Sequence, residues 1–247
     1  MLKEEPEVIW QREPPVLNIP STRPMVILSC AISLDGKLAS SRGDSSFSSF
    51  RDKRETHKLR SKVDAILVGI NTLLTDDPHL TISHKYYESN DHPIRIVLDS
   101  HARTPPDAQF ITKRSEVLSL VVTTQQTAKK QIDKLRTAGA EIRIVGKDRV
   151  DIPQLMRVLA SEYGVKKLMV EGGGRVIGSF FKHDLIDLAR ISVTPVVLGD
   201  EGGSVDLLRS VSFPTIASAP TFQLTRVELI DWNIVLHLLR KENRRKE

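Results

Sequence analysis

Short apolar runs alternate along the chain with segments in which apolar residues recur at helical spacing. Continuous runs of about 4–8 apolar residues indicate buried strands, and apolar residues three and four positions apart indicate amphipathic helices. Strands are predicted at 25–33, 64–70, 94–99, 117–123, 141–145 and 165–169, and helices at 50–63, 126–138, 152–163 and directly after residue 174. This alternation predicts an α/β fold with a mainly parallel central sheet and helices on both faces.

The C-terminal part of the chain follows a different pattern. A strand-like run at 189–198 is followed by two more, at 222–229 and 233–239, which lie close together around Asp231-Trp232. Strands joined by so short a connection pair in antiparallel fashion. We therefore predict an antiparallel hairpin at the edge of the sheet.

The first 24 residues are rich in proline, which cannot donate to a strand ladder and interrupts helices. We predict an extended arm over 1–24, held to the body by Trp10 and Val16. No internal repeat or clear linker divides the residues that follow. A single domain is therefore predicted over 25–240, with a charged tail at 241–247.

Three consecutive glycines lie between the predicted strand at 165–169 and a helical pattern. Glu171 stands at the end of the strand, and Gly172, Gly173 and Gly174 follow it. Glycine permits a positive φ and a close approach of the backbone to a ligand, and the free N–H groups of a helix start favour an anion. The motif predicts a site for a phosphate-bearing cofactor; the alternative is a glycine-rich turn without a ligand.

Two further stretches at strand ends carry candidate polar groups. Thr72 and Asp76 are four residues apart after the strand at 64–70, so on one helical turn they share a face and could hold a ribose or an amide. The alternative is a plain helix start that stops at Pro78. The serine-rich loop at 40–49 could bind a phosphate or a sugar, and it could equally be an ordinary loop.

The charge balance argues against nucleic-acid binding. The net charge is +5, but residues 240–247 hold five basic and two acidic side chains, so the rest of the chain carries only +2. A nucleic-acid binder would show a basic stripe on its folded body. We interpret the tail as a solvated end.

The single cysteine, Cys30, lies in an apolar run and cannot form a disulfide within the chain. A small buried thiol is the expected role. No apolar run approaches the roughly 18 residues of a membrane span, and the charged, proline-rich start is unlike a secretory signal. We expect a cytoplasmic protein that acts away from membranes.

Several catalytic motifs are missing from the sequence. There is no His-x-Glu with a later Pro-Cys-x-x-Cys, as in a zinc deaminase, and neither a P-loop nor a Gly-x-Ser-x-Gly elbow occurs. The histidines and the cysteine lack metal-ligand spacing, so no metal is expected. The glycine turn comes late and does not match Gly-x-Gly-x-x-Gly, so a dinucleotide would bind in a fold other than Rossmann.

Taken together, five motifs resemble the riboflavin-biosynthesis pyrimidine reductase family, whose fold is dihydrofolate-reductase-like. The resemblance covers about residues 24–240. It rests on Ala31-Ile-Ser-Leu-Asp-Gly-Lys37, Leu67-Val-Gly-Ile-Asn-Thr-Leu-Leu74, Asp76-Asp-Pro-His-Leu-Thr81, Pro93-Ile-Arg-Ile-Val-Leu-Asp-Ser100 and Glu171-Gly-Gly-Gly174.

The resemblance implies an oxidoreductase of riboflavin biosynthesis. It would reduce the ribosylamino side chain of 2,5-diamino-6-ribosylamino-4(3H)-pyrimidinone 5′-phosphate to the ribitylamino form. NADPH is the implied hydride donor, with NADH as the alternative, and the implied assembly is a homodimer. Because the deaminase signature is missing, the chain resembles the stand-alone archaeal or fungal type.

The resemblance also implies roles for particular residues. Relatives often have a basic residue at the position of Ser83 to meet the substrate phosphate, so Arg60 or Lys37 would have to take that role here. Glu171 is the candidate catalytic residue, and Glu171 or Asp35 would hold an opened imine of the substrate. The implied cofactor-binding residues are Ala31, Thr72, Asp76, Gly173, Gly174, Arg175, Val176 and Ile177, and the implied substrate-binding residues are Ser45, Arg60 and Glu171.

Two rival functions remain open from the sequence. Another reductase of the same fold, acting on a different pterin or pyrimidine, would keep Thr72, Asp76 and the glycine turn without needing Ser45 or Arg60. A non-catalytic nucleotide-binding regulator would bind the cofactor and fail to oxidise it.

Overall fold

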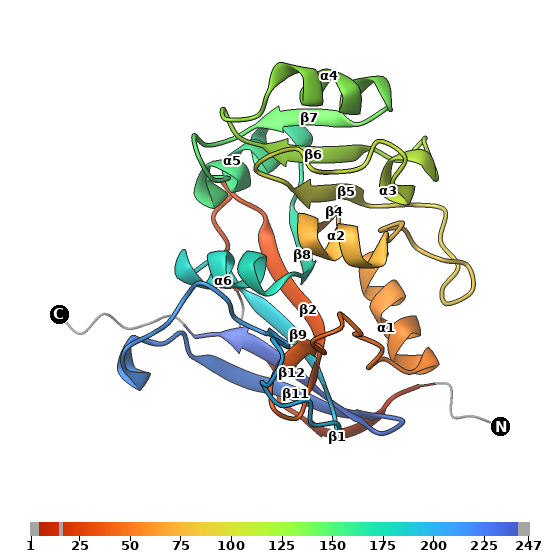
Figure 1. Ribbon diagram of the computed structural model, residues 1–247. Helices are drawn as coiled ribbons and strands as arrows, with labels where there is room; N and C mark the ends of the chain where they lie inside the picture. Colours follow the sequence, from red (N-terminus) through yellow and green to blue (C-terminus); the bar gives the residue numbers. More distant parts are fainter. Residues whose placement is uncertain (1–4, 15–16, 242–247) are drawn as a thin grey trace.

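A computed structural model describes residues 5–14 and 17–241, in which helices flank one large sheet (Figure 1). Its ten strands are β1 (Glu7–Gln11), β2 (Met25–Ser33), β4 (Ala65–Gly69), β5 (Ile94–Leu98), β6 (Ser119–Thr123), β7 (Glu141–Ile144), β8 (Lys167–Gly172), β9 (Leu188–Thr194), β11 (Phe222–Ile230) and β12 (Asn233–Arg240). They are arranged in the order β1-β11-β12-β9-β2-β8-β4-β5-β6-β7. A small separate sheet pairs β3 (Lys37–Ala39) with β10 (Val205–Asp206).

The sheet is parallel from β9 to β7 and antiparallel from β1 to β9. Its helices are α1 (Phe50–Arg60), α2 (Ile70–Asp76), α3 (Gln109–Thr112), α4 (Lys129–Thr137), α5 (Ile152–Tyr163) and α6 (Gly174–Lys182), and a 3₁₀ turn spans Ile216–Ser218. β7 and α4 lie at one end of the molecule, and the β11–β12 hairpin lies at the other (Figure 1).

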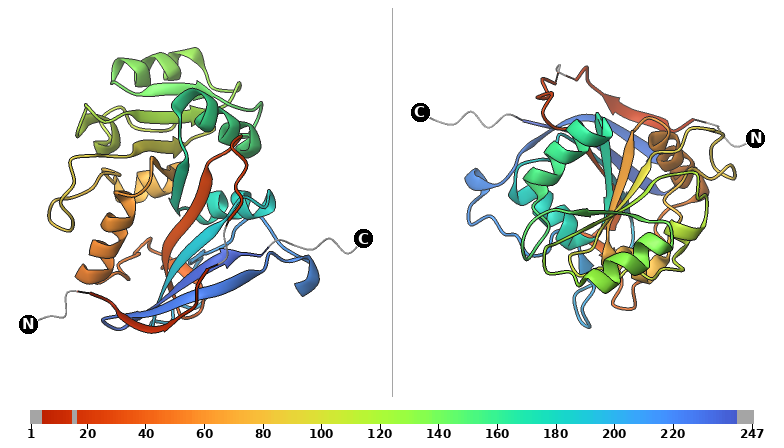
Figure 2. Two further views of the ribbon diagram at one scale, coloured as in Figure 1. Left: turned by 180° about the vertical axis from the view of Figure 1, so that it is seen from behind. Right: turned by 90° about the horizontal axis from the view of Figure 1, so that it is seen from above.

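Helices cover both faces of the parallel part of the sheet (Figure 2). On one face, β-strand residues such as Leu28 and Val170 pack against Leu155 of α5 and Phe180 of α6. On the other, residues such as Ile66 pack in a second core with apolar side chains of α2, α3 and α4. The predicted α/β architecture, with a mainly parallel sheet and a C-terminal antiparallel hairpin, is therefore confirmed.

Local sequence signals account for the element boundaries. The hydroxyl of Ser49 accepts the N–H of Asp52 and begins α1, while the carboxylate of Asp151 does the same for Gln154 at the start of α5. Helix α5 ends at Gly164 in the left-handed region, at φ +64°. The predicted helix at 50–63 ends earlier, at Arg60.

Part of the proline-rich arm forms a strand, whereas only an extended segment was expected from the sequence. Glu7–Gln11 form β1, which pairs antiparallel with β11. The prediction that the hairpin forms the edge of the sheet is therefore wrong, because β1 lies outside it. Trp10 is on β1, as expected for a residue that holds the arm, whereas Val16 lies outside the described residues.

The described residues contain no helix that is both long enough and apolar enough to cross a membrane.

Candidate active site

The predicted site residues converge where the order of strands reverses. The chain runs from β4 outward to β5, β6 and β7, returns to β8 between β4 and β2, and then places β9 on the far side of β2. In open parallel sheets, ligands bind outside the carboxyl ends of the strands at such a switch point. The carboxyl ends of β2, β4 and β8 carry Ser33, Gly69 and Gly172.

The glycine turn after β8 has the conformation expected of an anion site. Gly173 begins α6 with φ +87°, in the region that favours glycine. The N–H of Ile177 donates to the carbonyl of Gly173. Within the described chain, the N–H groups of Gly174, Arg175 and Val176 have no recorded acceptor, so the first turn of α6 offers free donors.

Thr72 and the glycine turn come together although they are about a hundred residues apart. A Cβ on Gly173 would lie 3.4 Å from Oγ1 of Thr72, and one on Gly172 would lie 3.6 Å from it. A Cβ on Gly69 would lie 2.8 Å from Cγ2 of Val176, so the end of β4 also packs tightly on α6. The start of α2 and the start of α6 therefore form one surface.

Asp76 ends α2, four residues after Thr72. Its side chain is exposed overall, yet desolvation of the carboxylate by neighbouring chain raises its pKa. It has no hydrogen-bond or ion-pair partner in the described part of the structure, which leaves both oxygens available to a ligand.

The other predicted cofactor residues differ in what they expose. Ala31 is half-buried on β2, beyond Leu28, the last residue of β2 that pairs with β8. Arg175 is exposed, but the side chain of Ile177 is fully buried in the core. Ile177 can therefore support the site only from behind.

Two of the three predicted substrate residues form a charged pair. Nε and Nη2 of Arg60, the last residue of α1, donate to the two carboxylate oxygens of Glu171, both at 2.6 Å. Nη1 of Arg60 donates to the carbonyl of Thr81 at 2.7 Å. Such a two-point pair fixes both side chains and directs Glu171 beside the glycine turn.

Ser45, the third predicted substrate residue, lies in the loop before α1. The loop reaches the cofactor side of the site, because a Cβ on Gly43 would lie 3.1 Å from Cγ2 of Thr75 on α2. Ser45 is exposed, and in the described chain its hydroxyl has no hydrogen bond to Arg60 or Glu171. It is near the cofactor helix and is not part of the charged pair.

Asp35 and Lys37 are occupied by other contacts. The Asp35 carboxylate accepts from the Ser33 hydroxyl (2.7 Å) and from the N–H groups of Leu198 (3.1 Å) and Gly199 (2.8 Å). These hydrogen bonds, the one from Ser33 foremost, lower the pKa of Asp35 to about 2. Asp35 thus fastens the loop after β9.

Lys37 is engaged in a similar way. Its Nζ contacts carboxylate oxygens of Asp206 (2.6 Å) and Asp200 (3.2 Å). A cation that already has two acidic partners is poorly placed to bind a phosphate.

His57 belongs to the same wall of the site and was missed by the sequence reasoning. Its Nδ1 accepts the N–H of Ser83 at 3.0 Å, which holds the segment after Thr81 against α1. Burial, followed by the charges of Arg60 and Lys53, lowers the pKa of His57 to about 4. The only signal for His57 in the sequence was its spacing from Lys53, four residues before it, and Arg60, three residues after it. This spacing places all three on one side of α1.

The residues present suit a nicotinamide dinucleotide. The first turn of α6 offers free N–H groups close to Thr72, because a Cβ added at Gly173 would contact that side chain. Exposed polar groups of α2 lie beside this turn. Backbone donors at a helix start match a pyrophosphate, and a hydroxyl and a carboxylate match ribose. No group of His, Cys, Asp and Glu side chains in the described residues could hold a metal ion.

Comparison with known proteins identifies the family. A family model described as the RibD C-terminal domain matches residues 24–236. The chain belongs to the RibD C-terminal domain family. Membership in this reductase family makes the protein an oxidoreductase and implies a nicotinamide cofactor.

Several curated relatives of this RibD-type chain are named reductases and are matched over most of their length. The 2,5-diamino-6-ribosylamino-4(3H)-pyrimidinone 5′-phosphate reductase of Methanothermobacter thermautotrophicus is 38% identical over 177 residues, which cover 72% of this chain and 80% of that protein. The protein of the same name from Archaeoglobus fulgidus is 33% identical over 218 residues, or 85% and 93%. Riboflavin biosynthesis protein RibD of Aquifex aeolicus is 32% identical over 195 residues, but the match covers only 52% of it.

Solved structures of riboflavin biosynthesis proteins share the fold. Acinetobacter baumannii RibD superposes with a TM-score of 0.76 at 23% identity, covering 90% of this chain and 59% of that chain. A Saccharomyces cerevisiae riboflavin biosynthesis reductase gives 0.66 at 24% identity, covering 91% and 93%. At these identities the likeness concerns the fold alone.

Proposed function

We propose that this protein reduces the ribosylamino side chain of 2,5-diamino-6-ribosylamino-4(3H)-pyrimidinone 5′-phosphate to the ribitylamino form, with NADPH as the reductant. The relatives that carry this reaction in their names match most of their own length. The observation that supports the reaction best is the Arg60–Glu171 pair, because it fixes a carboxylate next to the predicted anion site.

A bound nicotinamide would supply a hydride to C1′ of the ring-opened substrate, in which C1′ and the amino nitrogen form an imine. The nitrogen takes a proton from solvent, which gives the secondary amine of the ribityl product. Binding and orientation are the work of the protein. Gly174, Arg175 and Val176 offer N–H groups to the cofactor pyrophosphate, and Thr72 and Asp76 bind its sugar or amide.

Glu171 acts as a fixed acceptor for a substrate N–H or O–H group. Each of its oxygens already accepts one donor from Arg60, and a carboxylate held in this way serves as an acceptor and not as a proton donor. Arg60 is a positioning residue for Glu171. Ser45, from the loop beside α2, completes the substrate side, and Ala31 lines the cofactor side.

The test is loss of reduced-nicotinamide absorbance with the diamino substrate, run beside its deaminated 5-amino counterpart. Turnover of the diamino compound, with NADPH favoured over NADH, is the expected result. Turnover of only the deaminated compound would place the reaction after deamination. Cofactor binding without turnover of either would contradict the proposal and favour a regulator or a reductase of another substrate.

The Glu171→Gln variant tests the site directly. Glutamine keeps the shape but loses the charged pair with Arg60 and one acceptor oxygen, so kcat/KM should fall about 10- to 100-fold, which corresponds to about 1.4–2.7 kcal/mol. The dissociation constant for NADPH, measured by fluorescence, should stay within about threefold. A variant with full kcat/KM would remove Glu171 from the site.

We also propose that the chain acts as a homodimer and that it works away from membranes and nucleic acid. The support for the dimer is an apolar sheet face on β9, β11 and β12, on which Ile234 is exposed.

A further inference from the structure

Helix α1 is held to the sheet by charged contacts and not by an apolar face. Of its eleven residues, all of which the structure describes, only Asp52 is buried. Its two apolar residues contribute little, because Phe50 is 55% exposed and Leu59 is half-buried against the second core. The position of α1 on the sheet is therefore set by directional polar contacts.

The helix has one charged anchor near each end. At its start, Nη2 of Arg190 on β9 donates to Oδ1 of Asp52 at 2.6 Å, and the side chains of Arg190 and Asp52 are 7% and 1% exposed. At its end, Arg60 forms the two-point pair with Glu171 of β8. Helix α1 is therefore fastened to β9 at one end and to β8 at the other.

The two anchors lie level with each other on either side of β2, because the strand order is β9-β2-β8. Ser29 of β2 pairs with Arg190, and Leu28, one residue earlier, pairs with Val170, one residue before the anchor on β8. The anchors on the helix are eight residues apart, which is about 12 Å, and two strand spacings are about 10 Å. The length of α1 thus matches the distance that it has to span.

The pair of Asp52 and Arg190 does not have the form of a contact that serves stability alone. Oδ2 of Asp52 is buried and has no hydrogen-bond partner in the part of the chain that the structure describes. Burial of a charged pair has a desolvation cost that an apolar pair of similar volume avoids. What the charged pair supplies, and an apolar pair would not, is a fixed direction for the start of the helix.

We propose that Asp52 and Arg190 are positioning residues for the reduction. By fixing the start of α1 on β9, they set the position of Arg60 at its end, and Arg60 in turn directs the carboxylate of Glu171. Neither residue contacts substrate or cofactor. The proposal rests on the proposed function, in which Glu171 accepts an N–H or O–H group of the substrate.

The first test compares Asp52→Asn with Glu228→Gln. Glu228 is a matched control, because its side chain is 7% exposed and its recorded partners, Arg226 and His237, are on β11 and β12. Both variants should melt at a lower temperature, but only Asp52→Asn should lose about tenfold in kcat/KM for the diamino substrate, with the dissociation constant for NADPH within about threefold. A full kcat/KM in Asp52→Asn, or an equal loss in both variants, would overturn the proposal.

A double-mutant cycle tests whether the effect passes through Glu171. If it does, adding Asp52→Asn to Glu171→Gln should change kcat/KM by less than about threefold, because the carboxylate that Asp52 positions has already been altered. A further loss of about tenfold, which is the additive result, would contradict the proposal.

An apolar pair separates the position of the helix from its stability. Asp52→Leu combined with Arg190→Met removes the desolvation cost, so this variant should be at least as stable as the unaltered protein. Its kcat/KM should nevertheless stay at least about fivefold lower, because an apolar contact does not fix the direction of α1. Recovery of full kcat/KM would show that the charged pair acts through stability alone and would overturn the proposal.

The last test needs no turnover. The Nε–H of Arg60 donates to Glu171 at 2.6 Å, so its exchange with solvent, followed by NMR, should become at least about tenfold faster in Asp52→Asn and stay unchanged in Glu228→Gln. Equal exchange in Asp52→Asn and the unaltered protein would contradict the proposal. Faster exchange in Asp52→Asn, together with no turnover of the diamino substrate by the unaltered protein, would reject the proposed function and leave the coupling of Asp52 to Arg60 standing.

Discussion

Arg60 and Glu171 form the contact that joins the N-terminal half of the site to the C-terminal half. The two side chains are only 14% and 12% exposed, so their hydrogen bonds are formed largely out of water and are worth more than those of a surface pair. The motifs identified each of the two side chains from the sequence, but they did not identify the contact between them. No local pattern relates positions separated by 111 residues.

Two of the three glycines of the turn are required, each for a different reason. Only Gly173 has a positive φ, at +87°. A Cβ on Gly174 would lie 2.3 Å from the carbonyl oxygen of Asp206, so there the limitation is space. Gly172 lies close to Thr72 with room to spare.

Replacing Gly173 by alanine should weaken cofactor binding. The left-handed conformation costs alanine about 1–2 kcal/mol, and the new methyl group would lie near Oγ1 of Thr72, so we expect at least a tenfold rise in the dissociation constant for NADPH, measured by fluorescence. Gly164→Ala is the control, because Gly164 also has a positive φ but an added Cβ there meets nothing within 4 Å. Equal cofactor affinity in the two variants would show that the turn is not at the cofactor.

The loop after β9 is fastened to the β2–β3 turn through Asp35 and Lys37. Asp35 accepts the N–H groups of Leu198 and Gly199, and Lys37 contacts Asp200 and Asp206. From the sequence, the Asp-Gly-Lys motif was interpreted as a turn whose charged groups could contact the substrate. In the structure its charged groups serve the loop, because their partners lie more than 160 residues further along the chain.

The hydrogen bonds of Asp35 to the loop after β9 predict a specific pH dependence of the free energy of unfolding. The pKa of Asp35 is about 2 in the folded protein, below the usual value of 3.8, so its contribution is present above about pH 4 and is lost as the pH falls from 4 towards 2. Asp35→Asn should flatten the dependence of the unfolding free energy on pH in this window, measured by urea denaturation. It should also speed amide hydrogen exchange at Leu198 and Gly199. An unaltered pH dependence in the variant would contradict the assignment.

The residue ranges of the described helices and strands largely follow from the sequence. Which strands lie side by side in the sheet does not. The apolar pattern and Pro153 in the first turn predict α5 from Ile152 to Tyr163, as observed, and the structure shows Asp151 and Gly164 as its caps. Strand β1 was missed because its partner, β11, is more than 200 residues away and its own five residues are exposed. Proline content alone indicated only an extended chain.

The antiparallel end of the molecule buries several charged side chains on one face and exposes apolar side chains on the other. On one face, Arg190 of β9 contacts Asp52 of α1 at 2.6 Å, and Glu228 of β11 contacts His237 of β12 at 2.7 Å. These charged groups lie beneath the N-terminal half of the chain. The opposite face carries two cross-strand rows: Val193, Ile234 and Leu229, and then Ile191, Leu236, Val227 and Trp10.

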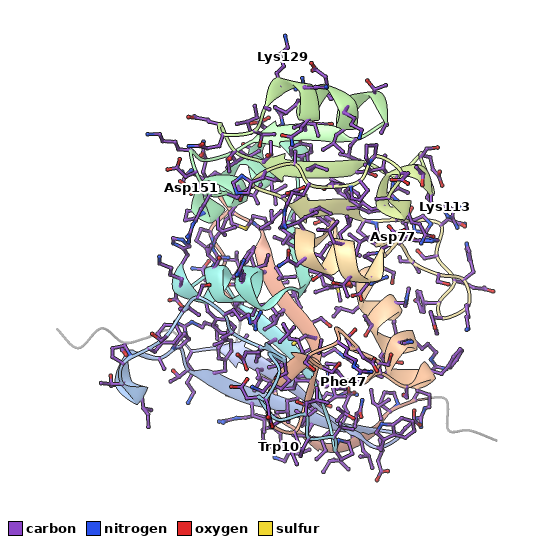
Figure 3. All side chains as sticks on the ribbon, in the orientation of Figure 1. Trp10, Phe47, Asp77, Lys113, Lys129 and Asp151 are labelled. Carbon is purple, nitrogen blue, oxygen red and sulfur yellow. The ribbon has the colours of Figure 1, made fainter. Side chains whose placement is uncertain are left out.

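This apolar face is the surface on which the proposed dimer would form. Ile234 is 49% exposed and Trp10 is 42% exposed, and Figure 3 shows Trp10 at the end of the molecule opposite Lys129. An exposed apolar sheet face of this kind marks an interaction surface.

Ile234→Asp should convert a dimer into a monomer, as measured by light scattering at micromolar concentration. A charge in the centre of the apolar rows would have to be buried without a partner, which disfavours association. Ile216→Asp is the control, since Ile216 is 90% exposed and lies outside these strands. A monomeric unaltered protein, or a variant that remains dimeric, would contradict the predicted surface.

The close packing of α6 against residues 206–209 has a consequence for synthesis of the protein. The carbonyl of Gly174 accepts the N–H of Arg209, and added Cβ atoms on Gly174 and Gly178 would each lie 2.3 Å from a carbonyl of this later segment. Part of the packing that supports helix α6 can therefore form only after residue 209 has left the ribosome. A nascent chain that ends near residue 190 contains every predicted cofactor and substrate residue and should still fail to retain the dinucleotide.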